Sequence, residues 1–125
     1  MSSERGSFAY EGLDRVMHER ARLGILSCMS SSEVALTFRD LKELCDLTDG
    51  NLSRHMKTLV EADLVIAERD DGEGRPQSIY CLSRTGRTRF LGYLAELERV
   101  VADAAPARSA LGRRRPRPRA DGAGA

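Results

Sequence analysis

Residues 40–65 read DLKELCDLTDGNLSRHMKTLVEADLV, and this stretch predicts two helices joined by a tight turn. Apolar residues recur at helical spacing over residues 39–47, which indicates the earlier of these two helices. After the turn, Thr48 fits the N-cap of a second helix, with Asp49 favourably placed at its positive end. We expect this second helix to run to about Ala62. Its predicted buried side chains are Leu52, Met56, Leu59 and Val60.

The segments on either side complete a recognisable order of elements. Residues 13–29 lack proline and predict a long first helix, and residues 34–38 are compatible with a brief strand. Residues 64–69 and 77–82 predict two strands joined by a glycine-rich turn, which together form a β-hairpin. Ser83 is expected to cap a last helix that ends near Ala104. The predicted fold is mainly α with a small β-hairpin wing, a winged helix-turn-helix with long first and last helices.

The length of 125 residues suits one domain, which we place at residues 11–105. Residues 1–10 are expected to be a flexible N-terminus. Residues 106–125 form an Arg/Pro-rich tail that we expect to be disordered, because it has too little apolar surface to offset the entropy of ordering. The tail holds six arginines and one aspartate, so the rest of the chain carries a formal charge of −4 within a total of +1.

The composition also limits where the protein acts. No apolar run is long enough to span a membrane, and the N-terminus has no hydrophobic signal core. Three cysteines without a pairing pattern indicate a reducing compartment. We therefore expect a cytoplasmic protein without a membrane partner.

The second helix of residues 40–65 has a face suited to double-stranded DNA. With Leu52, Met56 and Leu59 buried, a helical wheel places Gly50, Arg54 and Lys57 on the opposite side. Arg54 suits guanine or a phosphate, Asn51 suits adenine, and Lys57 and Ser53 suit phosphate oxygens. The predicted DNA-binding residues are Thr48, Gly50, Asn51, Ser53, Arg54, Lys57, Thr58 and, in the hairpin turn, Arg75.

These residues carry a resemblance to a known group. The stretch 40–65 resembles the helix-turn-helix of bacterial winged-helix regulators of the MarR/ArsR type, and residues 48–59 and 74–87 are similar to a small single-domain branch of that group. The resemblance implies a homodimeric transcription regulator, most simply a repressor on a near-palindromic operator, with Arg75 of the wing on the DNA. Two features depart from the pattern: the wing also holds Asp70, Asp71 and Glu73, and Asp63 stands where the related motif usually has glycine.

The resemblance further implies that the first and last helices form the dimer interface. The last helix independently shows an apolar four-three repeat typical of helix-on-helix packing, although it could pack on the first helix of the same chain instead. The predicted interface residues are Leu13, Val16, Met17, Phe90, Leu94, Leu97 and Val101.

Three other classes of function compete with DNA binding. An ArsR-like metal- or redox-responsive repressor would use Cys28, Cys45, Cys81, His18 or His55, but the paired Cys-x-Cys is missing and Cys45 is expected to be a lone buried cysteine. An enzyme is not expected, because no phosphate loop, nucleophile elbow or zinc-protease motif is present. A protein–protein adaptor remains an alternative because the body is acidic. No metal, cofactor or particular small-molecule effector is predicted.

The two histidines are assigned to the surface or to helix packing. His18 is expected at the surface or at an interface. His55 flanks the predicted DNA-binding face, where it could contact a phosphate or pack between helices.

Overall fold

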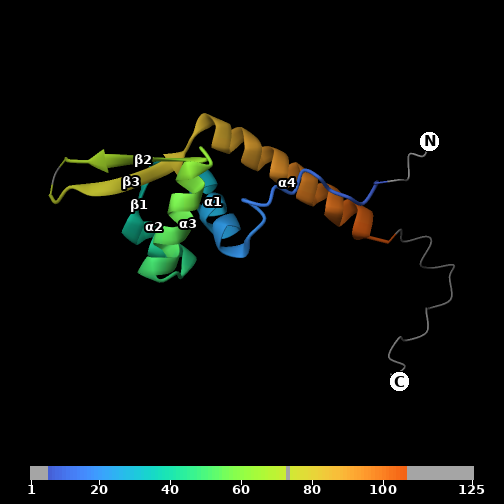
Figure 1. Ribbon diagram of the computed structural model, residues 1–125, viewed down its shortest axis with the longest axis horizontal. Coiled ribbons are helices and arrows are strands. Elements are labelled where there is room, and N and C mark those ends of the chain that lie inside the picture. The colour runs from blue at the N-terminus through green and yellow to red at the C-terminus, as the bar shows by residue number, and fades with distance from the viewer. Residues whose placement is uncertain (1–5, 73, 107–125) are drawn as a thin grey trace, which may run out of the picture.

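The computed structural model describes residues 6–72 and 74–106. In chain order it contains α1 (Arg20–Ser31), β1 (Leu36–Thr37), α2 (Phe38–Cys45), α3 (Asp49–Glu61), β2 (Val65–Asp70), β3 (Gln77–Leu82) and α4 (Arg84–Ala104). This order confirms the predicted winged helix-turn-helix (Figure 1). Residues 1–5 and nearly all of the arginine-rich tail lie outside the described residues.

The sheet has three antiparallel strands in the order β1-β3-β2, and β2 and β3 form the predicted hairpin. β1 adds only Leu36 and Thr37 to the edge of β3, so the strand predicted over residues 34–38 is too long. The reason is local: Thr37 accepts a hydrogen bond from the Asp40 amide, and the Asp40 carboxylate accepts one from the Thr37 amide. This capping box turns the chain into α2 at Phe38.

The first helix begins later than predicted. α1 starts at Arg20, and the part of the predicted helix between Leu13 and Glu19 forms turns. Two side chains cause this: Asp14 accepts hydrogen bonds from the Val16 and Met17 amides, and Glu19 caps α1 by accepting from the Arg22 amide at 2.9 Å. Such bonds offer the backbone a partner other than a continued helix.

The core is formed by one face of each element. It contains Met17, Ile25, Leu26, Met29, Leu36, Leu41, Leu52, Met56, Leu59, Leu64, Val65, Leu82, Phe90 and Tyr93. Three of the four residues predicted to be buried on α3 lie in this core, but Val60 is 36% exposed. Val60 lies on the outer side of α3, in a shallow groove that also contains Tyr80 of β3.

Residues 6–19 run along α4, which extends away from the body (Figure 1). The Tyr10 hydroxyl donates to Asp103 at 2.7 Å, the Gly12 amide donates to Glu96 at 3.2 Å, and Arg89 pairs with Asp14. The hydrogen bond from Arg89, together with those from two amides, outweighs the effect of burial and lowers the pKa of Asp14. Polar contacts therefore hold this segment against one side of α4.

Candidate nucleic-acid interface

The start of α3 is fixed by the turn before it and by its own cap. Asp46 adopts a left-handed backbone with φ of 55°, which ends α2. Thr48 is the N-cap as predicted, because its hydroxyl accepts from the Asn51 amide at 3.2 Å. Lys42 of α2 also pairs with Asp49 at 2.8 Å, which joins the two helices across the turn.

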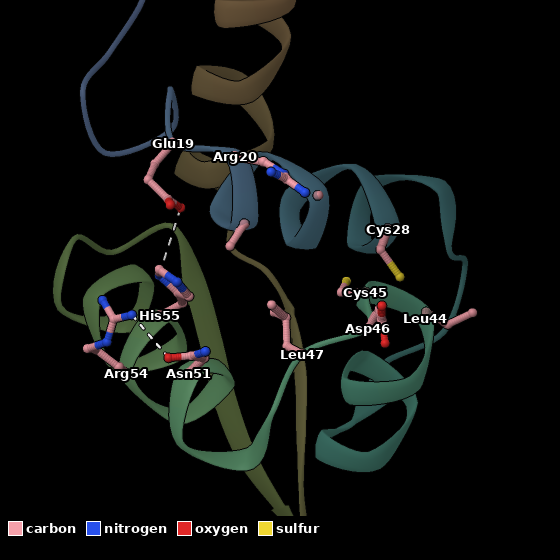
Figure 2. A pocket seen from close by; sticks show the side chains of 12 residues that line it. Glu19, Arg20, Cys28, Leu44, Cys45, Asp46, Leu47, Asn51, Arg54 and His55 are labelled. Atoms are coloured by element: carbon pink, nitrogen blue, oxygen red, sulfur yellow. Dashed lines mark hydrogen bonds and ion pairs between the residues drawn. The ribbon is translucent and has the colours of Figure 1, made fainter.

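One face of α3 is exposed and polar, and it lies opposite the buried face. Thr48, Gly50, Asn51, Ser53, Arg54 and Lys57 are all exposed. The Arg54 guanidinium donates to the Asn51 side-chain oxygen at 3.3 Å, so these two groups lie side by side (Figure 2). A Cβ added at Gly50 would meet no atom within 4 Å, which leaves this part of the helix open to a ligand. Arginine is among the side chains that read guanine in the major groove, and asparagine is among those that read adenine.

Unlike the other residues of α3 that are predicted to bind DNA, Thr58 is half-buried, and its hydroxyl is hydrogen-bonded within the helix. Its hydroxyl donates to the Arg54 carbonyl at 3.2 Å, so the proton of the hydroxyl is used inside the helix. A DNA contact by Thr58 stays a prediction.

His55 packs on α1. It is 5% exposed, Arg22 donates to its Nδ1 atom at 3.3 Å, and the Glu19 carboxylate lies 3.9 Å from the same atom. Burial lowers the pKa of His55 although Glu19 opposes the shift. The ring is therefore neutral and carries its proton on Nε2. Of the two roles considered for His55, the structure shows the packing role.

The wing carries Arg75 near the hairpin tip, where it is exposed. Figure 1 shows the tip projecting from the body at the end opposite the C-terminal end of α4. Two of the acidic side chains here have partners: Asp71 pairs with Arg69 at 3.5 Å, and Asp70 accepts from the Gly72 amide at 3.1 Å. Arg75 is thus exposed on a hairpin whose Asp70 and Asp71 side chains already have local partners, and Glu73 lies outside the described residues.

Asp63 adopts a left-handed backbone with φ of 63° between α3 and β2. Its carbonyl accepts from the Ser83 hydroxyl at 2.7 Å, which joins this turn to the start of α4. A left-handed conformation is easiest for glycine, so the geometry explains why glycine is usual at this place in the related motif.

The residues predicted for a dimer interface fall into two groups. Met17 and Phe90 belong to the core of the single chain, and Leu13, Val16, Leu94 and Leu97 pack partly against it. Val101 is 68% exposed and forms an open apolar surface with Leu94, Leu97 and the stem of Glu98. The four-three repeat of α4 thus packs within the chain at its N-terminal end and stays open further along.

Two residue contacts were missed by the sequence reasoning. Cys45 is expected from the sequence to be a lone buried cysteine, but it is half-buried, and the nearby Cys28 thiol helps to raise its pKa. The His18 Nδ1 atom lies 2.6 Å from the Tyr93 hydroxyl, and Tyr93 is a core residue. Tyr93 follows Phe90 by one helical turn, which is the pattern that would have indicated its burial.

The described residues contain no cluster of three or more metal-type ligands. Among them, no helix is long and apolar enough to cross a bilayer.

The comparisons with known proteins agree with this geometry. The model of the winged helix DNA-binding domain family matches residues 21–101. An uncharacterised protein of Methanocaldococcus jannaschii is 32% identical over 83 residues, which covers 66% of this chain and 89% of that protein. A transcriptional regulator homologue from Pyrococcus horikoshii has a similar structure with a TM-score of 0.69 at 22% identity, over 74% of this chain and 91% of that one.

MepR of S. aureus, solved in complex with DNA, has a TM-score of 0.63 at 15% identity, over 78% of this chain and 79% of MepR. A MarR family transcriptional regulator from Silicibacter pomeroyi is also similar, with a TM-score of 0.52 at 20% identity, over 81% of this chain and 66% of that one. The chain thus belongs to the winged helix DNA-binding domain family and has the fold of MarR-type transcriptional regulators.

Proposed function

We propose that this protein is a sequence-specific DNA-binding transcription regulator that acts as a homodimer on a near-palindromic operator. The observation that carries the proposal is the exposed Asn51–Arg54 pair on α3, opposite the buried face of the same helix. The two side chains stand next to each other on a capped helix whose open face suits the major groove. MepR, whose solved complex contains DNA, supports the proposal through its similar fold.

In this proposal Arg54, Asn51 and Ser53 contact bases, and Lys57 and Arg75 hold phosphates. Because Arg54 is already oriented by Asn51, little side-chain freedom is lost when it binds. Repression would follow if the operator overlaps a promoter, since bound protein would exclude the polymerase.

The homodimer is supported by the open side of α4. Residues 6–19 contact α4 through Asp103, Glu96 and Arg89, and a helical wheel places Leu94 and Val101 on a different side. A second copy of this apolar surface would cover both by two-fold symmetry. Two recognition helices related in this way fit half-sites about 34 Å apart.

The first experiment selects bound duplexes from a random pool with the full chain and measures affinity for the enriched site. Arg54→Ala should weaken binding by about 1–3 kcal/mol, or roughly 5- to 150-fold, if Arg54 makes a bidentate base contact. Arg99→Ala removes the same charge from α4 and is the matched control. Equal effects of the two variants would remove Arg54 from the reading face.

The tail needs a separate control because its six arginines and one aspartate give it a strong positive charge, whereas the rest of the chain is acidic. A full-length variant with glutamine at Arg108, Arg113, Arg114, Arg115, Arg117 and Arg119 should bind more weakly and with a shallower salt dependence, yet enrich the same site. Loss of all enrichment in this variant would instead show that DNA affinity is electrostatic attraction to the tail. A docking role for the body would then be favoured.

The oligomeric state has its own test. Val101→Glu places a charge on the open surface of α4 and should shift the protein to monomers in sedimentation equilibrium. Ala95→Glu adds the same charge elsewhere on α4, where the side chain is also exposed, and should leave the dimer intact. A dimer that is unaffected by Val101→Glu would place the interface elsewhere.

A further inference from the structure

Two cysteine thiols meet on the wall of an open groove in the helical body. Cys28 lies on α1, Cys45 is the last residue of α2, and each is half-buried. Each thiol shifts the pKa of the other, and Figure 2 shows the two side chains near each other where α1 and α2 meet. The groove has a volume of about 570 Å³, and both cysteines line it, so a small solute can reach them from solvent.

We propose that Cys28 and Cys45 form a redox-active dithiol that closes to an intramolecular disulfide when it meets a small disulfide oxidant. Three observations carry this inference: the thiols come from different helices, their side chains lie near each other where α1 meets α2, and one groove exposes both. Cys81 is exposed on β3 and does not line that groove. The reactivity of Cys81 can therefore be compared with that of the two cysteines in the groove.

The groups around the pair assign different roles to the two thiols. Burial raises the pKa of both, and it reaches about 11 for Cys45, where negative charge on Cys28 adds to the effect. The neighbouring Cys45 thiol opposes the rise in the pKa of Cys28. Cys28 therefore ionises first and attacks, and Cys45 completes the reaction. Since only a thiolate is nucleophilic, the rate rises with pH.

The reaction balances as an ordinary thiol–disulfide exchange. The Cys28 thiolate attacks one sulfur of the oxidant R–S–S–R, a Cys28–S–S–R bond forms, and R–S⁻ leaves and takes up a proton. Cys45 then loses its proton and attacks the Cys28 sulfur, which forms the protein disulfide and releases the second R–S⁻. Two electrons and two protons pass from the cysteines to the oxidant, which leaves as two thiols.

The position of Cys45 links this chemistry to α3. Cys45 directly precedes Asp46, whose left-handed backbone leads into the Thr48 cap. Asn51 and Arg54 line the same groove as the two cysteines (Figure 2). A disulfide that draws the end of α2 toward α1 is therefore expected to displace the turn from Asp46 to Thr48, from which α3 begins. The expected loss of DNA affinity rests on the proposed function, whereas disulfide formation does not.

The first test maps disulfides in the full chain carrying Cys81→Ser, which removes the competing thiol. The protein is treated with bis(2-hydroxyethyl) disulfide, the remaining thiols are blocked, and the digest is analysed by mass spectrometry. A Cys28–Cys45 linked peptide is expected, formed about tenfold faster for each unit of pH below the thiol pKa. Unreacted thiols, or stable mixed disulfides on both cysteines, would overturn the proposal.

Further variants separate this pair from general thiol reactivity. Cys28→Ser and Cys45→Ser, each combined with Cys81→Ser, should give no intramolecular disulfide. The unaltered chain should give the same Cys28–Cys45 peptide. If it gives only a Cys81–Cys81 bond between chains, the dithiol assignment is wrong, and this result does not depend on how the serine variants fold.

The second test compares the reduced and oxidised Cys81→Ser proteins on the enriched DNA site. Oxidation should weaken binding at least about tenfold, and reduction with dithiothreitol should restore it, since about 1.4 kcal/mol of lost contact is enough. Equal binding by both forms would refute the coupling to α3. If the reduced form selects no DNA while the disulfide forms, the proposed function fails and the dithiol stands.

Discussion

Replacing Gly86 with alanine tests how closely the start of α4 packs against the backbone of Leu64, just before β2. Gly86 lies in the first turn of α4, and its amide donates to the capping Ser83 hydroxyl at 2.7 Å. A Cβ at this position would lie 2.0 Å from the Leu64 carbonyl oxygen and 2.8 Å from the carbonyl carbon. Both are backbone atoms, so no side-chain rotation can relieve the overlap. The same oxygen also accepts from the Ser83 amide at 3.0 Å, and this bond would be strained if the backbone moved away.

The expected cost follows from these contacts. Real Cβ atoms essentially never approach another heavy atom closer than 3.0 Å, so the backbone must separate by about 1 Å or more. Overpacking of this kind costs about 1–3 kcal/mol, and weakening a buried hydrogen bond adds about 1 kcal/mol. Alanine in a helix is otherwise favoured over glycine by about 0.5–1 kcal/mol. The free energy of unfolding should therefore fall by about 1–3.5 kcal/mol.

Urea unfolding of the full chain measures this effect, with both variants at one fixed protein concentration so that any self-association contributes equally. Gly92→Ala is the matched control: it lies in the same helix, and an added Cβ would meet nothing within 4 Å. Gly92→Ala should gain about 0.5–1 kcal/mol from helix propensity alone. If Gly86→Ala is as stable as Gly92→Ala, then α4 does not begin against the Leu64 backbone and the reasoning fails.

Three smaller predictions concern stability. Thr48→Ala should lower the free energy of unfolding by about 1 kcal/mol because it removes the cap of α3, whereas Thr88→Ala, exposed on α4, should change it little in the same urea titration. Asp63→Gly should raise the free energy of unfolding by about 1 kcal/mol by relieving the left-handed backbone, and Asp63→Ala should lower it; the reverse order in thermal unfolding would contradict the strain argument. Burial holds the pKa of His55 below its ordinary value of 6.5, so the unfolded chain binds this proton more readily than the folded one. Stability should be intact above about pH 6.5 and fall as the pH drops through that value, and His55→Gln should flatten this part of the curve.

The helical and hairpin elements were predictable because their signals are local. Thr48 and Ser83 sit at the positions where their side chains cap α3 and α4, and both caps follow from sequence spacing alone. The bounds of β3 were predicted as observed, since its apolar run lies between a turn and a capping serine.

The less predictable features depend on partners that are distant in sequence. Residues 13–19 have the apolar spacing of a helix, yet Asp14 pairs with Arg89 and accepts two nearby amides, which favours turns. The contact of Cys28 with Cys45 depends on how α1 crosses α2, and neither residue signals it alone. On α3, the exposed face was predictable from the wheel, but the Asn51–Arg54 hydrogen bond required side-chain geometry.

The hydrogen bond from Tyr10 to Asp103 brings the two ends of the described part of the chain close together. It joins residues 93 positions apart, near the two ends of the described part of the chain. Contacts so distant in sequence carry the largest loop-closure cost, so residues 6–19 should dock on α4 only after the helix-turn-helix has formed. The same closeness suits a circular permutant of residues 6–106, in which a linker joins the segments next to Tyr10 and Asp103 and new ends open at the hairpin tip. The order of the elements along the chain could then change while their arrangement in space is kept.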